Sequence, residues 1–393
     1  MEHLGVYIQV PFCASKCSFC NFSSRVARQD VYEGYCRALC GEIDDLPAFY
    51  QSAGVDPSLL ALSADTLYIG GGTPSLMGEG RLGKILEALR RRINFAPRVE
   101  FTLEMTPGSG GIEFLRSAGA LGVNRLSIGA QSLDDRELRA VGRLHSADDT
   151  RELIATARAA EFRNINLDLI AGLPHQTEAS WQSTLRSALD LRPEHLSVYL
   201  FEIDEKSRLG GEVLQHGTRY HAPSVPGDDF MAEAYEAALE RLRQEGYRQY
   251  EISNFALPGS ESAHNLKYWQ LKPYIGLGAG AHSFDGRRRW ENETTVQVYE
   301  SNLARKASPI STVRQLSDSE QVEEFFFLGL RQREGIDLAE ARKRWGARQL
   351  APWTQRVKAL EGDGWLERVN HRLRLTDHAL LVSNEIFQQF IAV

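Results

Sequence analysis

Short apolar runs alternate with amphipathic segments along the N-terminal part of the chain. Each run is rich in β-branched, aromatic and leucine residues and stops at glycine, proline or polar residues, which is typical of buried strands. The predicted strands are Leu4–Val10, Asp65–Gly71, Glu100–Thr106, Arg125–Gln131, Ile165–Ala171 and His195–Ile203. The segments between them have helical periodicity, and six β-then-α units in succession predict an α/β fold with a parallel sheet. Because a closed barrel has eight such units, we expect a partial, open (β/α)6 barrel.

The pattern changes in the second half of the chain. Residues 204–227 show little apolar periodicity, which predicts a loop. Residues 247–309 are rich in glycine, histidine and aromatic residues without a regular period. Three helical runs, a short hairpin over Trp365–Val369 and Arg372–Leu375, and a last helix from about Thr376 predict a mainly α, winged-helix-like domain. The expected organisation is therefore a barrel over residues 1–246, an irregular extension over 247–309 and a C-terminal domain over 310–393.

Charge and hydropathy narrow the expected partners and compartment. The net charge of the chain is −7, and residues 310–393 hold 12 Lys or Arg and 12 Asp or Glu. A DNA-binding wing is normally basic, so this balance argues against a nucleic-acid partner. No apolar run approaches the roughly 20 residues of a membrane span, and no N-terminal signal is visible, so we expect a cytosolic protein.

Three of the five cysteines lie together directly after the first predicted strand. Cys13, Cys17 and Cys20 have C-x3-C-x2-C spacing, which lets one loop hold a soft metal centre from one side. A zinc site would need a fourth ligand, but Cys36 and Cys40 lie in a helix-like segment and are expected to pack as small hydrophobic residues. The alternative is an iron–sulfur cluster with one open iron that binds a small ligand.

Polar residues and glycines occur at the ends of the following strands. A triple glycine over residues 70–72 precedes Thr73 and lets the backbone approach a ligand closely. Glu104 and Asp168 lie within apolar strands, where a carboxylate is costly unless it is paired. They could form a structural ion pair with Arg143, or bind a polar ligand that carries amine, carboxylate and ribose groups. Their succession along the strand ends favours the ligand site.

These motifs resemble the radical S-adenosylmethionine (SAM) superfamily, and within it the oxygen-independent coproporphyrinogen III oxidase group, over nearly the whole chain. The resemblance implies a 4Fe–4S cluster on Cys13, Cys17 and Cys20, with SAM on the open iron. It also implies that SAM is lined by Tyr7, Gly71, Gly72, Thr73, Glu104, Gln131, Arg143 and Asp168. The group usually has histidine where this chain has Gln9, which removes an acid–base group from that position.

The group divides into porphyrinogen oxidases and haem chaperones of the HemW type. The oxidases resemble C-x3-C-x2-C-x-C, whereas this chain has Phe22 at the last position. It also carries the chaperone-like motif His-Asn-x-x-Tyr-Trp at residues 264–269. Imidazole can ligate haem iron and flat rings can pack on a porphyrin. The haem-binding candidates are His264, Tyr268, Trp269 and, in a Gly-Ala-His segment, His282.

The resemblance therefore implies a haem chaperone that binds a cluster, SAM and haem. Its implied partners are respiratory haem proteins that accept haem, a bacterioferritin-like donor, and membrane proteins contacted peripherally. The first alternative is oxidative decarboxylation of coproporphyrinogen III to protoporphyrinogen IX. The second is a nucleic-acid adaptor that uses the C-terminal domain. No catalytic side chain is assigned by the sequence.

Overall fold

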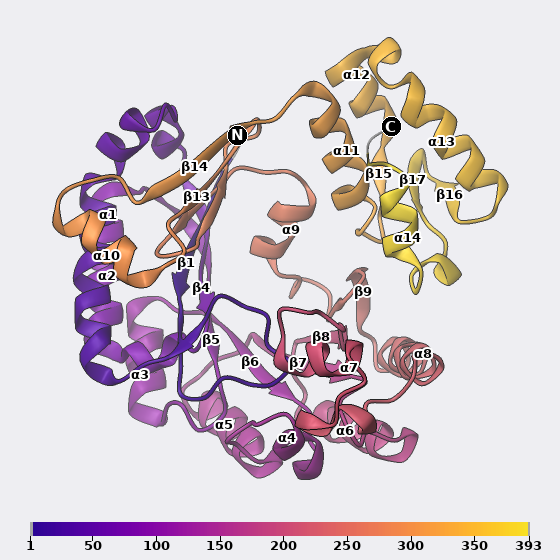
Figure 1. Ribbon diagram of the computed structural model, residues 1–393, viewed down its shortest axis with the longest axis horizontal. Coiled ribbons are helices and arrows are strands. Elements are labelled where there is room, and N and C mark those ends of the chain that lie inside the picture. The colour runs from indigo at the N-terminus through magenta and orange to yellow at the C-terminus, as the bar shows by residue number, and fades with distance from the viewer. Residues whose placement is uncertain (1–2, 392–393) are drawn as a thin grey trace.

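Six adjacent parallel strands form the centre of the structure, a computed structural model that describes residues 3–391. They are β1 (Leu4–Val10), β4 (Ala64–Gly71), β5 (Phe95–Met105), β6 (Arg125–Gln131), β7 (Ile165–Ala171) and β8 (His195–Leu200). Each corresponds to one of the predicted strands, and neighbours in the sequence are neighbours in the sheet. The predicted α/β fold with a partial, open barrel is confirmed (Figure 1).

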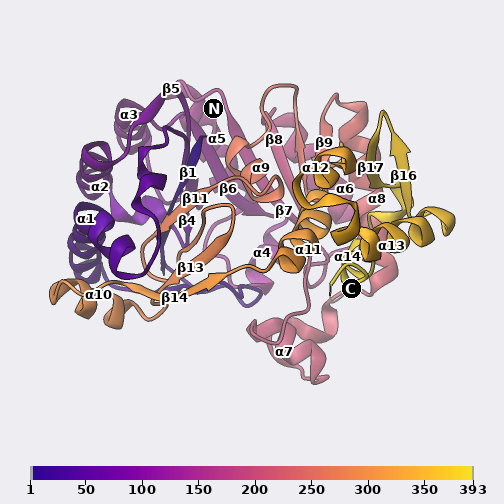
Figure 2. The ribbon, with the colours of Figure 1, turned by 90° about the horizontal axis from the view of Figure 1, so that it is seen from above.

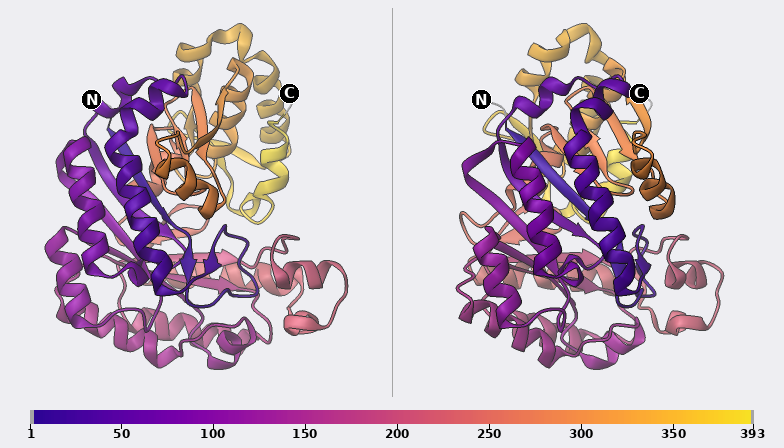
Figure 3. Two further views of the ribbon diagram at one scale, coloured as in Figure 1. Left: turned by 60° about the vertical axis from the view of Figure 1, so that its left-hand side comes forward. Right: turned by 90° about the vertical axis from the view of Figure 1, so that its left-hand side faces the viewer.

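Helices cover the outer face of this sheet (Figure 3). They are α1 (Gln29–Ser52), α2 (Glu79–Arg92), α3 (Ile112–Leu121), α4 (Asp135–Ala140), α5 (Ala147–Ala159), α6 (Glu178–Asp190) and α8 (Asp228–Gln244), with 3-10 turns at η1 (Pro57–Ala61) and η2 (Pro74–Met77). Helix α5 starts at a capping box, in which Ser146 N donates to Asp149 Oδ2 at 2.7 Å and Asp149 N donates to Ser146 Oγ at 3.2 Å. Their apolar faces, such as Leu39 and Ile43 of α1, share one core with the strands.

The sheet extends on both sides of the barrel to twelve strands. On one side β11 (Tyr274–Leu277) pairs in parallel with β1, and β12 (His282–Phe284), β13 (Arg288–Asn292) and β14 (Ile310–Gln315) follow in antiparallel order. On the other side β10 (Asn254–Ala256) and β9 (Arg248–Glu251) pair beyond β8. The stretch predicted to be irregular therefore contains strands, together with α9 (Ala263–Trp269) and α10 (Val296–Ala304). Strands of three to five residues are too short for periodicity to reveal.

Residues 204–227, predicted as a loop, contain α7 (Arg208–Leu214) and the 3-10 segment η3 (Arg219–Ser224). Two glycines in α7 and left-handed backbone at Tyr220 (φ 55°) and His221 (φ 59°) hide these turns from the sequence pattern. The segment projects from the body of the protein (Figure 2). Its Leu209 N donates to Ser18 O at 2.8 Å, so it supports the loop that carries the cysteines.

The C-terminal part packs around apolar residues that include Phe326, Trp353, Leu373 and Phe390, and these are continuous with the core of the barrel. Its elements are α11 (Asp318–Gly329), β15 (Ile336–Asp337), α12 (Leu338–Gln349), α13 (Ala351–Gly362), β16 (Leu366–Val369), β17 (Arg372–Leu375), η4 (Asp377–Ala379) and α14 (Ser383–Gln388). The three helices and the hairpin agree with the winged-helix-like pattern. None of the helices in residues 3–391 is long and apolar enough to cross a membrane.

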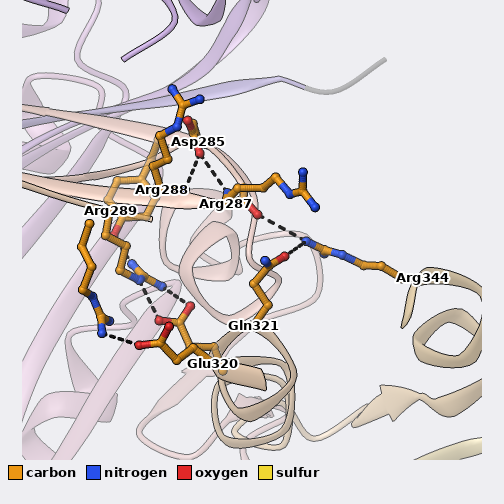
Figure 4. A network of polar contacts seen from close by, with 11 residues as sticks. Asp285, Arg287, Arg288, Arg289, Glu320, Gln321 and Arg344 are labelled. Atoms are coloured by element: carbon orange, nitrogen blue, oxygen red, sulfur yellow. Dashed lines mark hydrogen bonds and ion pairs between the residues drawn. The ribbon is translucent and has the colours of Figure 1, made fainter. Parts of the chain in front are cut away.

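Polar contacts join the C-terminal domain to the β12–β13 hairpin (Figure 4). The guanidinium of Arg289 binds both carboxylate oxygens of Glu324 at 2.8 Å. Arg344 donates to Gly286 O at 3.3 Å and to Gln321 Oε1 at 3.1 Å, and Arg314 lies 2.6 Å from Glu320 at the exposed side. These contacts fix one side of the C-terminal domain against the sheet.

Candidate functional site

The three cysteines lie on one braced loop, residues 13–24, which we call the cysteine loop. It lies between the paired short strands β2 (Phe12–Cys13) and β3 (Arg25–Val26). Lys16 Nζ donates to Phe22 O at 3.1 Å and to Ser24 O at 3.0 Å, which closes the loop on itself. All three thiols are free, and burial raises the pKa of the Cys13 thiol. A positively charged centre is therefore needed to hold that cysteine as a thiolate.

The cysteine loop and the C-terminal ends of β4 to β8 line one cavity of about 840 Å³. Of the residues predicted to bind the cluster or SAM, all except Tyr7 contribute to its lining. They are Cys13, Cys17, Cys20, Gly71, Gly72, Thr73, Glu104, Gln131, Arg143 and Asp168. Parallel strands deliver these side chains to the same edge of the barrel, which is where such folds hold their ligands. Tyr7 lies deeper, with its ring centre 6.0 Å from that of the cavity-lining Tyr68.

The glycines after β4 let the backbone pass where a side chain would not fit. A Cβ on Gly72 would stand 2.3 Å from the backbone oxygen of Phe12, and one on Gly71 would stand 2.6 Å from the amide of Gln9. Gly71 also has a left-handed φ of 109°, which favours glycine. The glycine turn is therefore pressed against β1 and the cysteine loop, and its backbone forms the cavity wall.

Glu104 and Asp168 are partly buried carboxylates that line the cavity. Glu104 accepts hydrogen bonds from Tyr68 OH at 2.8 Å and from Gly71 N at 2.9 Å, and burial raises its pKa to about 7. Burial also raises the pKa of Asp168, which accepts from Asn166 Nδ2 at 2.8 Å. Neither forms an ion pair with Arg143 among the described residues. They are thus available to a ligand that carries ammonium or hydroxyl groups.

Arg143 and Gln131 occupy constrained positions beside the cysteines. Arg143 donates to Gly129 O at 2.5 Å, and its NH1 lies 3.6 Å from the sulfur of Cys17. Gln131 has a left-handed φ of 68°, a conformation that costs about 1 kcal/mol or more in a residue with a side chain. Such local strain is commonly found at ligand sites, where the surrounding structure holds it in place.

Other residues of the cavity were missed by the sequence analysis. On β6, Arg125 and Ser127 line the cavity together with Gly129 and Gln131, at every second position. Period-two alternation places such residues on one face of a strand, so this signal was present in the sequence. Arg125 is 1% exposed and its Nε has no hydrogen-bond partner among the described residues. Its charge lowers the pKa of both carboxylates, against the larger effect of burial.

His264 of the His-Asn-x-x-Tyr-Trp motif lies on α9 and is 1% exposed. Its Nδ1 is 2.8 Å from Thr66 Oγ1 and its Nε2 is 2.9 Å from Tyr268 OH, so both ring nitrogens are engaged. Burial lowers its pKa to about 3. The ring stacks near Tyr68 at 5.2 Å, behind the cavity wall. Asn265, the next residue of the motif, lines the cavity.

The remaining haem candidates also lie outside the cavity lining. Trp269 packs its ring under the guanidinium of Arg331 at 4.5 Å. His282 is on β12 with a side chain 66% exposed, and its Nδ1 lies 3.6 Å from Glu291 Oε2. The structure thus separates the two candidate imidazoles, because one is buried behind the cavity and the other faces solvent.

Sequence comparisons agree with this architecture. Residues 7–188 match the model of the radical SAM superfamily, and residues 316–382 match that of the HemN C-terminal domain. The chain is 34% identical over 388 residues to the heme chaperone HemW of Bacillus subtilis, covering 98% of this chain and 99% of the relative. The chain belongs to the HemW family of radical SAM proteins. The HemW of Escherichia coli is 30% identical over 393 residues, covering 99% of this chain and 98% of the relative.

The chain is also similar to proteins with other names. The mitochondrial radical S-adenosyl methionine domain-containing protein 1 of Bos taurus is 32% identical over 406 residues, with 100% of this chain and 88% of the relative covered. The coproporphyrinogen III oxidase HemN of Escherichia coli has a similar solved structure. Its TM-score is 0.84 at 22% identity, and the match covers 100% of this chain and 90% of that one. At that identity the likeness supports the fold alone.

For a radical SAM member of the HemW family, a 4Fe–4S cluster and SAM are the cofactors, and the donor set fits them. The three free thiols line one cavity beside the glycine turn and two partly buried carboxylates. A multi-iron cluster takes its thiolate ligands on different iron atoms, which suits three cysteines spaced along one loop.

Proposed function

We propose that this protein is a cytosolic haem chaperone that binds a 4Fe–4S cluster, SAM and haem. The observation that carries the proposal is the cysteine loop itself, which lines the cavity with three cysteines and has Phe22, 64% exposed, after the last of them. The relatives from Bacillus subtilis and Escherichia coli, aligned over almost the entire chain, are heme chaperones by name. Respiratory haem proteins would be the acceptors, with a bacterioferritin-like donor and peripheral contact with membrane proteins as further proposed partners.

The residues that would hold the two resident cofactors divide by chemistry. Cys13, Cys17 and Cys20 would ligate the cluster, which when bound supplies an open iron and one electron for cleavage of SAM. Glu104 would accept a hydrogen bond from the ammonium of SAM, and Asp168 would accept one from a ribose hydroxyl. The remaining contacts would come from the backbone of Gly71, Gly72 and Thr73, from Gln131 and Arg143, and from Tyr7 through Tyr68.

The proposed haem ligands differ in what binding would require. Ligation by His264 requires that one of its two hydrogen bonds, to Thr66 or to Tyr268, breaks so that a ring nitrogen becomes free for the iron. Ligation by His282 leaves the fold unchanged, because that side chain already faces solvent. Tyr268 and Trp269 would then support the site from α9 rather than touch haem in the conformation described here.

A haem titration of the full-length protein tests this proposal. Wild type, His264→Ala, His282→Ala and His371→Ala, an exposed histidine of the β16–β17 turn, are titrated and their visible spectra compared. Loss of the axial imidazole should weaken binding at least about ten-fold and shift the Soret band in one of the first two variants only. Tight binding with an unchanged spectrum in both variants would show that neither histidine is the haem ligand. Absence of haem binding by the wild type would overturn the proposed function.

The second candidate function is oxidation of coproporphyrinogen III. The observation in its favour is the fold, which matches that of HemN over the whole chain. Phe22, at the position where the oxidases carry a further cysteine, argues against it. Anaerobic assay of the reconstituted protein with coproporphyrinogen III and SAM decides between the two functions. Formation of protoporphyrinogen IX would show that the protein is the oxidase, and its absence would favour the haem chaperone.

A further inference from the structure

The lining of the cavity also includes side chains from β8, α8, the β9–β10 turn and the C-terminal domain. This part of the cavity, which we call the outer compartment, is lined by Tyr199, Tyr235, Ile252, Arg331, Leu380 and Leu381. Its walls combine aromatic rings and aliphatic side chains, and Tyr199 is 39% exposed to it and to solvent. Such walls suit a flat, largely apolar ligand.

Arg331 is the cation of the outer compartment, and it follows directly after α11. Its guanidinium stacks on the ring of Trp269 at 4.5 Å, and its side chain is 24% exposed. Its Nε is buried and has no hydrogen-bond partner among the described residues. Stacking fixes the plane of a guanidinium without using its N–H donors, so the donors on its exposed part remain available to a ligand.

The acid next to Arg331 forms an ion pair with it but accepts no hydrogen bond from it. Glu251 is fully buried, and its Oε1 accepts from Ser253 N at 2.9 Å and from Asn254 Nδ2 at 2.5 Å. Its Oε2 lies 3.7 Å from Arg331 NH2, beyond hydrogen-bond length, and has no partner among the described residues. An arginine and a buried acid at this spacing leave the outward edge of the guanidinium for a second carboxylate.

We propose that Arg331, held in place by Trp269, binds a carboxylate of the ligand in the outer compartment. The proposal rests on the proposed haem function, in which the carboxylate is a haem propionate. A planar guanidinium matches a carboxylate in a two-bond arrangement, which gives orientation as well as affinity. Trp269 then acts as a positioning residue. The last position of the His-Asn-x-x-Tyr-Trp motif contributes to binding through the arginine that it supports.

The test compares haem with haem dimethyl ester, in which both carboxylates are esterified, on the full-length protein. Wild type should bind the ester about ten-fold or more weakly than haem. Arg331→Gln should bind haem with the same loss and should no longer distinguish the two ligands. Arg356→Gln, an exposed arginine of the same domain bonded to Gln389, is the charge-matched control and should behave as wild type. Trp269→Leu should reduce the preference for haem only when Arg331 is present.

The outcomes separate this proposal from the proposed function. Equal binding of haem and its ester by wild type would overturn the carboxylate anchor and leave haem binding intact. A loss in Arg331→Gln that is equal for both ligands would assign the residue a structural role and would also overturn the anchor. Failure of wild type to bind either ligand would overturn both proposals. The comparison of the two ligands on wild type requires no variant to fold.

Discussion

The cavity has two walls that are built in different ways. On the wall formed by the cysteine loop and the strand ends, the residues of the C-x3-C-x2-C motif and of the glycine turn themselves face the cavity. On the α9 wall, His264 and Trp269 lie behind the surface, and Asn265 and Arg331 face the cavity. The difference follows from local structure, because a loop can turn every ligand inward, whereas a helix distributes a six-residue motif over all its sides. A motif on a helix therefore contains supporting residues as well as contacting ones.

The largest effect is expected from the cysteine wall. Cys17→Ser should reduce the bound iron and sulfide of the anaerobically reconstituted protein almost to background, because two thiolates cannot hold the cluster. Cys40→Ser is the matched control, since Cys40 lies in α1 and outside the cavity lining. It should retain the full iron content. Equal iron loss in both variants would assign the effect to folding rather than to ligation.

How far the sequence predicts these walls depends on the range of the contacts. The cysteine spacing, the glycine turn and the strand order are local patterns, and the structure places them as expected, apart from Tyr7. Arg331 and Trp269 come together only because α11 packs near α9, and no local pattern encodes that contact. The burial of His264 likewise depends on Thr66, which is 198 residues away along the chain. Short strands such as β12 were missed because three residues cannot show a period.

A pH dependence distinguishes the ligand-facing carboxylate from one that is only structural. Glu104 is partly buried and Glu42 is fully buried, and removal from water raises the pKa of each to about 7. Glu42 accepts from Tyr299 OH at 2.5 Å and from Gly278 N at 2.8 Å, away from the cavity lining. Glu104 would meet the ammonium of SAM, which requires the ionised form. SAM affinity should therefore rise about ten-fold between pH 6 and pH 8, as the ionised fraction rises from about a tenth to about nine-tenths.

Two variants locate the origin of that dependence. Glu104→Gln should bind SAM weakly, and its affinity should show only the titration of the ligand's own amine. Glu42→Gln should keep the rise of SAM affinity with pH that wild type shows. The ligand's own amine titrates equally in both variants, so comparing their pH profiles isolates the contribution of Glu104. For stability the sign is opposite, because both folded-state pKa values are raised above that of an unfolded glutamate. Each group therefore destabilises the fold as pH rises from about 4.5 to about 7, so each Gln variant should flatten that decline.

Effects on stability rather than on cofactor binding are expected at the contacts that hold the C-terminal domain, and with it the outer compartment, against the sheet. The side chains of Arg289 and Glu324 are only 28% and 10% exposed and form a two-bond ion pair, so Arg289→Gln leaves a largely buried carboxylate without its partner. We expect a loss of about 2 kcal/mol in the free energy of unfolding, measured by urea titration. The side chains of Arg314 and Glu320 are 58% and 36% exposed, so Arg314→Gln should cost below about 1 kcal/mol, and less at high salt. If the two variants lose the same stability at both salt concentrations, burial is not what strengthens the inner pair. The C-terminal domain would then be held mainly by apolar contacts, such as those of Tyr274, Phe284 and Leu316.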